Sequence, residues 1–242
     1  MKTHLDAVKR FLLMGQGEFI HNLMETLSGQ LDQPTHQIYK HNLVDSIRSA
    51  ITSSNTQYLE ADIINRVSAR LLEGGGDGWD TFSLDYIIDA PLNTLLSPEA
   101  MKNYLRIFNL LWKIKRVDHS LNQVWLSHAK ETQRVRGKDE QGKFHLSHLL
   151  RYAMMHFVTN VFSYIMVTIE SAWENFMKDL DRASNFDEVL QMHDKLLVEL
   201  LDITFLSSRT RSIHTALFSV FQIIYRFKIT QDKLLTDYRI HV

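Results

Sequence analysis

The chain is long enough for one large domain, and its charges nearly balance. Its 242 residues include 27 Lys and Arg, 28 Asp and Glu and no cysteine, for a formal net charge of −1. This balance removes the attraction that sequence-independent nucleic-acid binding needs, and the lack of cysteine excludes disulfides and thiolate metal ligands. Hydrophobic residues make up 45% of the chain, so we expect a well-packed cytosolic protein with one domain over residues 1–242.

No secretory signal or membrane span is expected. The apolar run near the N-terminus is short and interrupted by charges. The most apolar stretch, Tyr152 to Ile169, contains His156, Asn160 and Ser163 and makes a poor membrane span. We therefore expect no membrane partner.

The first third of the chain is predicted to begin with three helices. The first covers about residues 4–14 and is interrupted by Gly15-Gln16-Gly17. The second has apolar residues at helical spacing from Phe19 to Leu27, and the third follows Pro34 and ends near Ile51.

The next segment has the alternation of a β-hairpin. Apolar and polar residues alternate over residues 67–71 and again over 82–88, and the glycine-rich loop 74–78 between them can reverse the chain. A short helix over residues 66–72 is the alternative for the first run. A two-stranded hairpin is marginal alone, so this one must pack on helices.

Long helices are expected over the rest of the chain. Ser97-Pro98-Glu99 is typical of a helix start, and this helix continues to about Glu131. A polar loop over 134–143 precedes a helix over about 146–180, then one from a capping box at Ser184 to Phe205, and a last one over about 210–238. The fold class predicted is all-α: a bundle of long helices with one small β-hairpin insert.

The helix that begins at Ser97 is predicted to be the buried spine of the fold. Its polar residues form one narrow stripe, and apolar residues, including Trp112 and Trp125, fill much of the remaining surface. Trp112 is expected in the core. The stripe consists of Lys102, Arg106, Asn109, Lys113 and Arg116.

No catalytic, cofactor or metal site is expected. The GxG at residues 15–17 lacks a preceding strand and a third glycine, and His145 and His148 lack a third ligand at a fixed spacing. Asp80, Asp85 and Asp89 flank the hairpin without any accompanying catalytic set and are interpreted as surface carboxylates. Basic residues at 113–116 and 134–138 lack interleaved exposed aromatics, which indicates no nucleic-acid site.

Two blocks of the sequence stand out: FLLMGQGEFIHNLM, which opens at Phe11, and the stretch from Gly78 to Leu121, in which FSLDY, Pro91 and FNLLWKIKR follow one another. They resemble the C-terminal half of gamma-tubulin complex components, which has a strand, a proline and a helix in that order. Residues 156–176 and 186–201 resemble its later helices more loosely. GQG, SNTQ at Ser54–Gln57 and GWD at Gly78–Asp80 look nearest to component three, the spindle-pole branch.

The resemblance implies a scaffold without enzymatic activity that binds gamma-tubulin and acts with other gamma-tubulin complex components. It implies a place in the cytoplasm and cytoskeleton, at a microtubule organising centre or spindle pole. The family's N-terminal half, which packs sideways on its neighbours, and its closing helices are absent from these 242 residues, so the chain looks like an isolated binding half.

The residues expected to bind the partner combine this resemblance with their chemistry. Glycines at 15 and 17 allow close backbone approach, Asp85 lies on the polar side of a strand, and Arg116 ends the polar stripe. Burial of Tyr86 in the core is an open alternative. The proposed binding residues are Gly15, Gln16, Gly17, Phe19, Asp85, Tyr86 and Arg116.

Two other classes of function stay open. One is a different helical interaction module, such as a subunit of a tethering complex, and the other is an all-α enzyme. A binding assay with gamma-tubulin would distinguish a different helical interaction module from a gamma-tubulin complex component. An apolar pocket with buried carboxylates would favour an enzyme.

Overall fold

Helices dominate the part of the chain that the structure describes. The computed structural model describes residues 1–54, 61–72, 77–134 and 145–241. It is 79% helical, and its one small sheet has two strands, which confirms the all-α fold with a hairpin insert. The expected glycine-rich loop at 74–76 and the polar loop at 135–143 lie outside the described residues.

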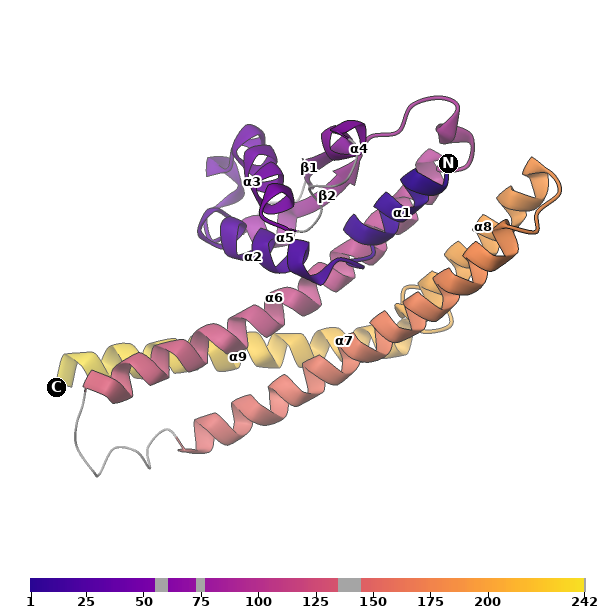
Figure 1. The fold of residues 1–242 in the computed structure, drawn as a ribbon. Helices are drawn as coiled ribbons and strands as arrows, with labels where there is room; N and C mark the ends of the chain where they lie inside the picture. The colour runs from indigo at the N-terminus through magenta and orange to yellow at the C-terminus, as the bar shows by residue number, and fades with distance from the viewer. Residues whose placement is uncertain (55–60, 73–76, 135–144, 242) are drawn as a thin grey trace. The chain divides into compact units, whose positions relative to one another are not determined.

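The elements follow one another in nearly the expected order (Figure 1). They are α1 (Lys2–Phe11), α2 (Gly17–Leu31), η1 (Thr35–Gln37), α3 (Lys40–Thr52), α4 (Ala61–Arg66), β1 (Val67–Leu71), α5 (Gly78–Thr81), β2 (Phe82–Tyr86), η2 (Leu92–Thr94), α6 (Pro98–Arg134), α7 (His145–Leu180), α8 (Phe186–Ile203) and α9 (Arg211–His241). The short helices α4 and α5, which frame the hairpin, were not expected. The alternative helix over residues 66–72 is wrong, because α4 ends at Arg66 and a strand follows.

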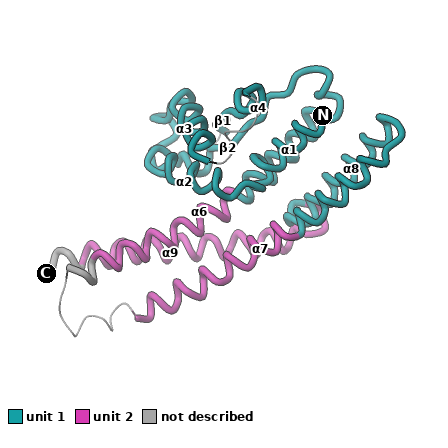
Figure 2. The backbone as a smooth tube through the Cα atoms, viewed as in Figure 1, with its two compact units in different colours: residues 1–111, 168–206 teal, residues 112–167, 207–242 magenta. Residues whose placement is uncertain are grey.

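The chain divides into two compact units, coloured in Figure 2. Unit 1 comprises residues 1–111 and 168–206, and unit 2 comprises residues 112–167 and 207–242. Two of the three boundaries fall inside α6 and α7, which both continue from one unit into the other, and the third lies between α8 and α9. The expectation of one domain over the whole chain therefore stays a prediction.

In unit 1, α2, α3 and α5 gather around the hairpin (Figure 1). The strands pair antiparallel, with Val67 opposite Tyr86 and Leu71 opposite Phe82, and α3 packs against β1. Every residue of β2 except Asp85 is buried. The hairpin thus gains from helices the stability that two strands lack in water.

Gly78 lies where two backbones approach closely. A β-carbon added at Gly78 would meet the Cδ1 of Ile38 and would come within 2.9 Å of the Leu31 backbone. Next to it, the indole Nε1 of Trp79 donates to a carboxylate oxygen of Asp32 at 2.7 Å. This contact ties α5 to the end of α2.

The core of unit 1 also holds one buried polar pair. The hydroxyl of Tyr104 in α6 lies 3.0 Å from Nε2 of His193 in α8, and both side chains are buried. The ring of Phe176 in α7 packs on the same imidazole, with centroids 6.1 Å apart. One hydrogen bond therefore joins two helices that are far apart in sequence.

In unit 2, α6 contacts both α7 and α9 through cations over aromatic rings. The Lys115 ammonium lies 4.0 Å from the centroid of Phe162 in α7. The Arg116 guanidinium lies 5.0 Å from Tyr225 in α9, and the Lys113 ammonium lies 5.1 Å from Phe218. Burial lowers the pKa of Lys115, which shows that its apolar stem and charge are partly withdrawn from water.

Two tryptophans of the predicted spine helix, α6, differ in burial. Trp112 is 1% exposed, which confirms its place in the core. Trp125, in contrast, is 46% exposed. Its placement among the packed residues was wrong, because the apolar surface of α6 near that position is not completely covered by other described elements.

The start of α8 has a capping box one residue later than the predicted Ser184–Asp187, with Asn185 and Glu188 as its members. The Asn185 side chain accepts from the Glu188 backbone N–H at 2.8 Å, and the Glu188 carboxylate accepts from the Ser184 N–H at 2.8 Å. Replacing Asn185 with alanine should lower the free energy of unfolding by about 1 kcal/mol. Chemical denaturation measures this, and the neighbouring change Ser184→Ala should cost less than about 0.5 kcal/mol. Equal losses in both variants would contradict a capping role for Asn185.

Candidate partner-binding surface

The turn between α1 and α2 is a defined structure. Met14 adopts the left-handed conformation with φ of 55°. The chain then closes back on α1, since the Gly15 N–H donates to the Lys9 carbonyl at 3.0 Å and the Gln16 N–H to the Arg10 carbonyl at 3.3 Å. These bonds satisfy carbonyls that the end of a helix leaves without partners.

The predicted residues of this turn differ in exposure. Gly15 and Gly17 are exposed and Gln16 is partly exposed, whereas Phe19 is fully buried. The Phe19 ring packs edge-on against Phe11 with centroids 5.0 Å apart. Phe19 thus anchors α2 to α1, and the glycines form the accessible part of the turn.

Gly17 has open space around it. A β-carbon added there meets no atom within 4 Å, apart from its chain neighbours and its own helix. A β-carbon at this position is therefore accommodated without touching the core. The fold alone gives no reason for a glycine here.

The two predicted binding residues on β2, Asp85 and Tyr86, differ in burial. Asp85 is partly exposed and forms an ion pair with Arg70 of β1 at 3.7 Å. Tyr86 is 3% exposed, and its hydroxyl lies 2.8 Å from Nδ1 of His4 in α1. Desolvation by burial raises the pKa of Tyr86 to about 12. The Tyr86 side chain therefore belongs to the core, the alternative that the sequence left open.

The carboxylates beside the hairpin serve ion pairs. Arg66 binds Asp62 at 2.8 Å and Asp89 at 2.9 Å, and it also donates to the Ile87 carbonyl at 3.3 Å. The hydrogen bond from Arg66 lowers the pKa of Asp62. These contacts hold the segment after β2 against α4. The two carboxylates therefore have a structural role rather than one in acid–base chemistry.

Arg116, the third predicted region, lies in unit 2. Its guanidinium is partly exposed over the Tyr225 ring, so one face of the cation is used inside the unit. The structure brings Asp85 and Tyr86 together on β2 and the three residues 15–17 together in one turn, all in unit 1. It does not bring Arg116 together with them within one unit.

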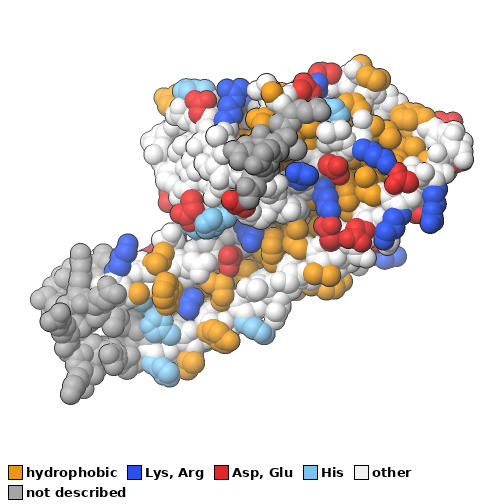
Figure 3. All heavy atoms as spheres, viewed as in Figure 1, with side chains coloured by type: hydrophobic (Ala, Val, Ile, Leu, Met, Phe, Trp, Pro, Cys, Tyr) orange, Lys and Arg blue, Asp and Glu red, His pale blue; other side chains and the backbone are white. Residues whose placement is uncertain are grey.

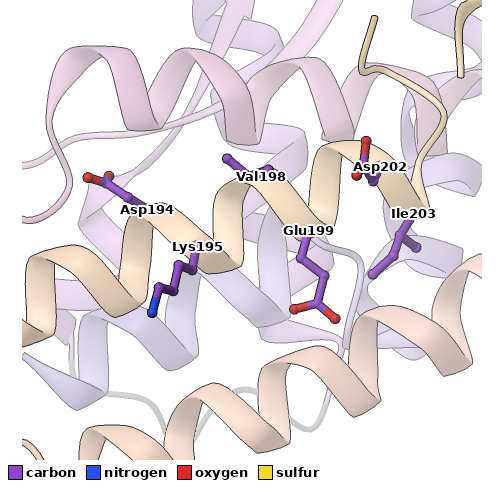
Figure 4. Close-up of a pocket in the computed structure, with 6 residues that line it drawn as sticks. All are labelled: Asp194, Lys195, Val198, Glu199, Asp202 and Ile203. Atoms are coloured by element: carbon purple, nitrogen blue, oxygen red, sulfur yellow. The ribbon is translucent and has the colours of Figure 1, made fainter. Parts of the chain in front are cut away.

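A shallow hollow of about 480 Å³ lies on α8 (Figure 4). Val198 and Ile203 supply its apolar part, and its charged rim consists of Asp194, Lys195, Glu199 and Asp202. Figure 4 shows the Asp194 and Lys195 side chains pointing to opposite sides of the helix. The carboxylates do not converge as a catalytic pair would.

His128 of α6 and His148 of α7 form a pair of packed rings. The rings of His128 and His148 pack edge-on with centroids 5.3 Å apart. Burial lowers the pKa of each, and the neighbouring Arg151 adds to the effect. Among the described residues there is no group of three or more His, Cys, Asp or Glu that could hold a metal ion.

Among the described residues, α7 is the one helix that is long and apolar enough, by length and composition, to cross a membrane. Within the protein, 17% of its most apolar 18-residue window is buried. The sequence analysis expected a poor span because of its polar residues. The exposed apolar surface of α7 is the main feature that sequence reasoning missed.

Comparison with known proteins identifies the family. The family model described as gamma tubulin complex component C-terminal matches residues 1–240. The chain belongs to the gamma-tubulin complex component family.

Relatives within this family cover nearly the whole chain. Spindle pole body component 98 of Dictyostelium discoideum is 39% identical over 237 residues, which are 96% of this chain and 29% of that protein. The gamma-tubulin complex component 3 homolog of Xenopus laevis is 35% identical, and gamma-tubulin complex component 3 of Homo sapiens is 34% identical, each over 96% of this chain and 26% of the relative. The resemblance to component three is confirmed. The chain spans less than a third of the length of these gamma-tubulin complex components.

Proposed function

We propose that the chain holds gamma-tubulin as part of a gamma-tubulin complex and positions it for microtubule nucleation. Its partners are gamma-tubulin and other gamma-tubulin complex components, and its place is a microtubule organising centre or spindle pole. The observation that carries this proposal is the match of residues 1–240 to the C-terminal part of the family. Relatives with the names spindle pole body component and gamma-tubulin complex component support it.

The role is that of a scaffold without a chemical step. The carboxylates beside the hairpin form ion pairs with arginines, and the hollow on α8 is open with diverging charges. Figure 3 shows basic and acidic side chains interspersed on the visible face. Such a surface suits recognition by local contacts rather than by a strong field of one sign.

In unit 1, the accessible residues that reach the partner are Gly15, Gln16, Gly17 and Asp85, while Phe19 and Tyr86 hold the turn and β2 in place from the core. In unit 2, a separate contact is made by Arg116. The open space at Gly17 allows another protein's backbone or side chain to approach the start of α2. Arg116 contributes the exposed part of a cation to the rim of the contact.

The test measures binding of purified gamma-tubulin to the chain and to two variants. Gly17→Trp should weaken binding about tenfold or more by occupying the contact surface, since a β-carbon added at this position meets no atom within 4 Å in the fold. Arg116→Glu should weaken binding by a similar factor and change its salt dependence. Binding isotherms by biolayer interferometry give both constants.

Matched controls come from the same helices. Gly29→Trp places the same side chain at the other end of α2, where an added β-carbon also meets no atom within 4 Å. Lys102→Glu reverses a charge on an exposed residue of α6. Full binding by Gly17→Trp and Arg116→Glu would reject this surface. Failure of the unmodified, folded chain to bind gamma-tubulin would reject the proposed function itself.

A further inference from the structure

The near-neutral charge of the chain is the sum of two large and opposite charges. Unit 1 holds 12 Lys and Arg against 22 Asp and Glu, which gives a net charge of −10. Unit 2 holds 15 Lys and Arg against 6 Asp and Glu, which gives a net charge of +9. Exposed charges farther apart than about 8 Å are largely screened at physiological salt, so each surface acts through its own charges. The total of −1 therefore does not exclude an anionic partner for unit 2.

The helix α9, which belongs wholly to unit 2 (Figure 2), has a buried side and an exposed side. The buried side consists of Leu217, Phe221, Ile224, Gln231 and Leu235. The exposed side carries three large aliphatic residues, Ile223, Ile229 and Leu234, which are 55%, 54% and 44% exposed. It also carries two exposed cations, Arg226 and Lys233. These last five residues are called the α9 face below.

The two cations lie along the middle of the α9 face. Arg226 and Lys233 are seven residues apart, so they lie on the same side of the helix, about 10 Å from each other along its axis. At about 100° per residue, Ile229 lies on one flank of this line, and Ile223 and Leu234 lie on the other. Each cation thus has aliphatic side chains on both sides.

We propose that the α9 face binds an acidic amphipathic helix of a partner protein. Within the part of the chain that the structure describes, neither Arg226 nor Lys233 forms an ion pair. Carboxylates seven residues apart on the partner helix match the spacing of the two cations, and apolar side chains beside them pack on the aliphatic flanks. Asp237, one turn beyond Lys233, ends the cationic part of this side.

The order of residues across the α9 face favours a protein over other polyanions. A helix that lies on a lipid surface turns one apolar side into the lipid and has its cations on the opposite, polar side, whereas here the cations lie between aliphatic residues. Nucleic-acid sites combine cations with stacking aromatics and hydrogen-bonding groups, which give exposed isoleucines no partner. An acidic amphipathic helix satisfies both the cations and the aliphatic flanks.

Fluorescence anisotropy with a labelled synthetic peptide tests the inference on the whole chain. The probe is a peptide of about 20 residues, long enough for a helix, with glutamate and leucine on one side and alanine and glutamine elsewhere. A scrambled peptide of the same composition is its control. We expect the chain to bind the designed peptide more tightly than the scrambled one, with an affinity that falls as sodium chloride increases. Because the probe is synthetic, the result does not depend on whether the chain binds gamma-tubulin.

Charge reversal on the α9 face should remove most of this binding. The double variant Arg226→Glu, Lys233→Glu should bind the designed peptide about tenfold or more weakly and with little salt dependence. The matched control reverses Arg182 and Lys195, an exposed arginine and an exposed lysine of unit 1, and should keep the original affinity. Ile223→Ser tests the aliphatic flank and should weaken binding about threefold or more without changing the salt dependence. Circular dichroism checks that each variant keeps its helices.

Three results would overturn the inference. They are no binding of the designed peptide at low salt, equal binding of the designed and scrambled peptides, and equal losses in the α9 and unit 1 double variants. Phosphatidylserine vesicles and a thymidine oligonucleotide provide the remaining arms. Binding of either one without the peptide, lost in the Arg226→Glu, Lys233→Glu variant, would assign the two cations to a lipid surface or a nucleic acid instead.

Discussion

Replacing Trp112 with alanine is expected to lower the free energy of unfolding by about 3–5 kcal/mol. The indole is 1% exposed on α6, so its removal loses the transfer free energy of a large ring and leaves a cavity that close-packed neighbours fill only in part. Urea unfolding followed by circular dichroism measures the loss.

Trp125 provides the control on the same helix. It is 46% exposed, so Trp125→Ala removes the same atoms with far less loss of packing and should cost less than about 1 kcal/mol. Equal unfolding midpoints and slopes for Trp112→Ala and the unmodified chain would show that α6 does not form the core of the fold.

Acidification from pH 6.5 to pH 4 is expected to destabilise the protein by roughly 3 kcal/mol through His193 alone. Desolvation by burial lowers the pKa of His193 from 6.5 to about 4, against a small opposing effect of Asp194. The folded state thus keeps the imidazole neutral, while the unfolded chain binds a proton below pH 6.5. Since the unfolded state binds more protons in this window, stability is full above pH 6.5 and falls as the pH decreases to about 4.

Unfolding curves at several pH values give the contribution of His193 by difference. His193→Gln cannot take up this proton, so its stability should vary less with pH between 6.5 and 4, whatever its stability at neutral pH. Some variation should remain, because burial also lowers the pKa of His128 and His148. His21→Gln, a change at an exposed residue of α2, serves as the control. A pH dependence that is the same in His193→Gln and the unmodified chain would refute the assignment.

The parts of the fold that depend on local chemistry were predictable from the sequence. The Ser97 hydroxyl accepts from the Ala100 N–H at 3.2 Å, and α6 begins at Pro98 as expected. The strands of the hairpin begin where the alternation does. The end of α1 was placed too late, because Met14 leaves the helix in a left-handed conformation that a methionine rarely adopts and that sequence patterns do not indicate.

The tertiary features of the candidate surface were not predictable in the same way. Alternation along β2 cannot tell a tyrosine that points to a partner from one that binds His4 in another helix. The polar stripe of α6 likewise gives no sign that Lys113, Lys115 and Arg116 lie over rings of α7 and α9. Uncharged residues recur at steps of four and three along α7 in the sequence, but only the structure shows that apolar side chains such as those of Leu146 and Val167 are exposed.

Gly78 and Gly17 differ in whether the fold itself requires a glycine. At Gly78, any β-carbon would collide with Ile38 and the Leu31 backbone, so folding alone selects against every other residue there. At Gly17, an added β-carbon meets no atom within 4 Å, so packing does not require a glycine there. A glycine kept at position 78 in homologous chains would therefore report only packing. A glycine kept at position 17 would report selection by something outside the fold, and a survey of sequences could thus detect a binding constraint that a stability measurement cannot.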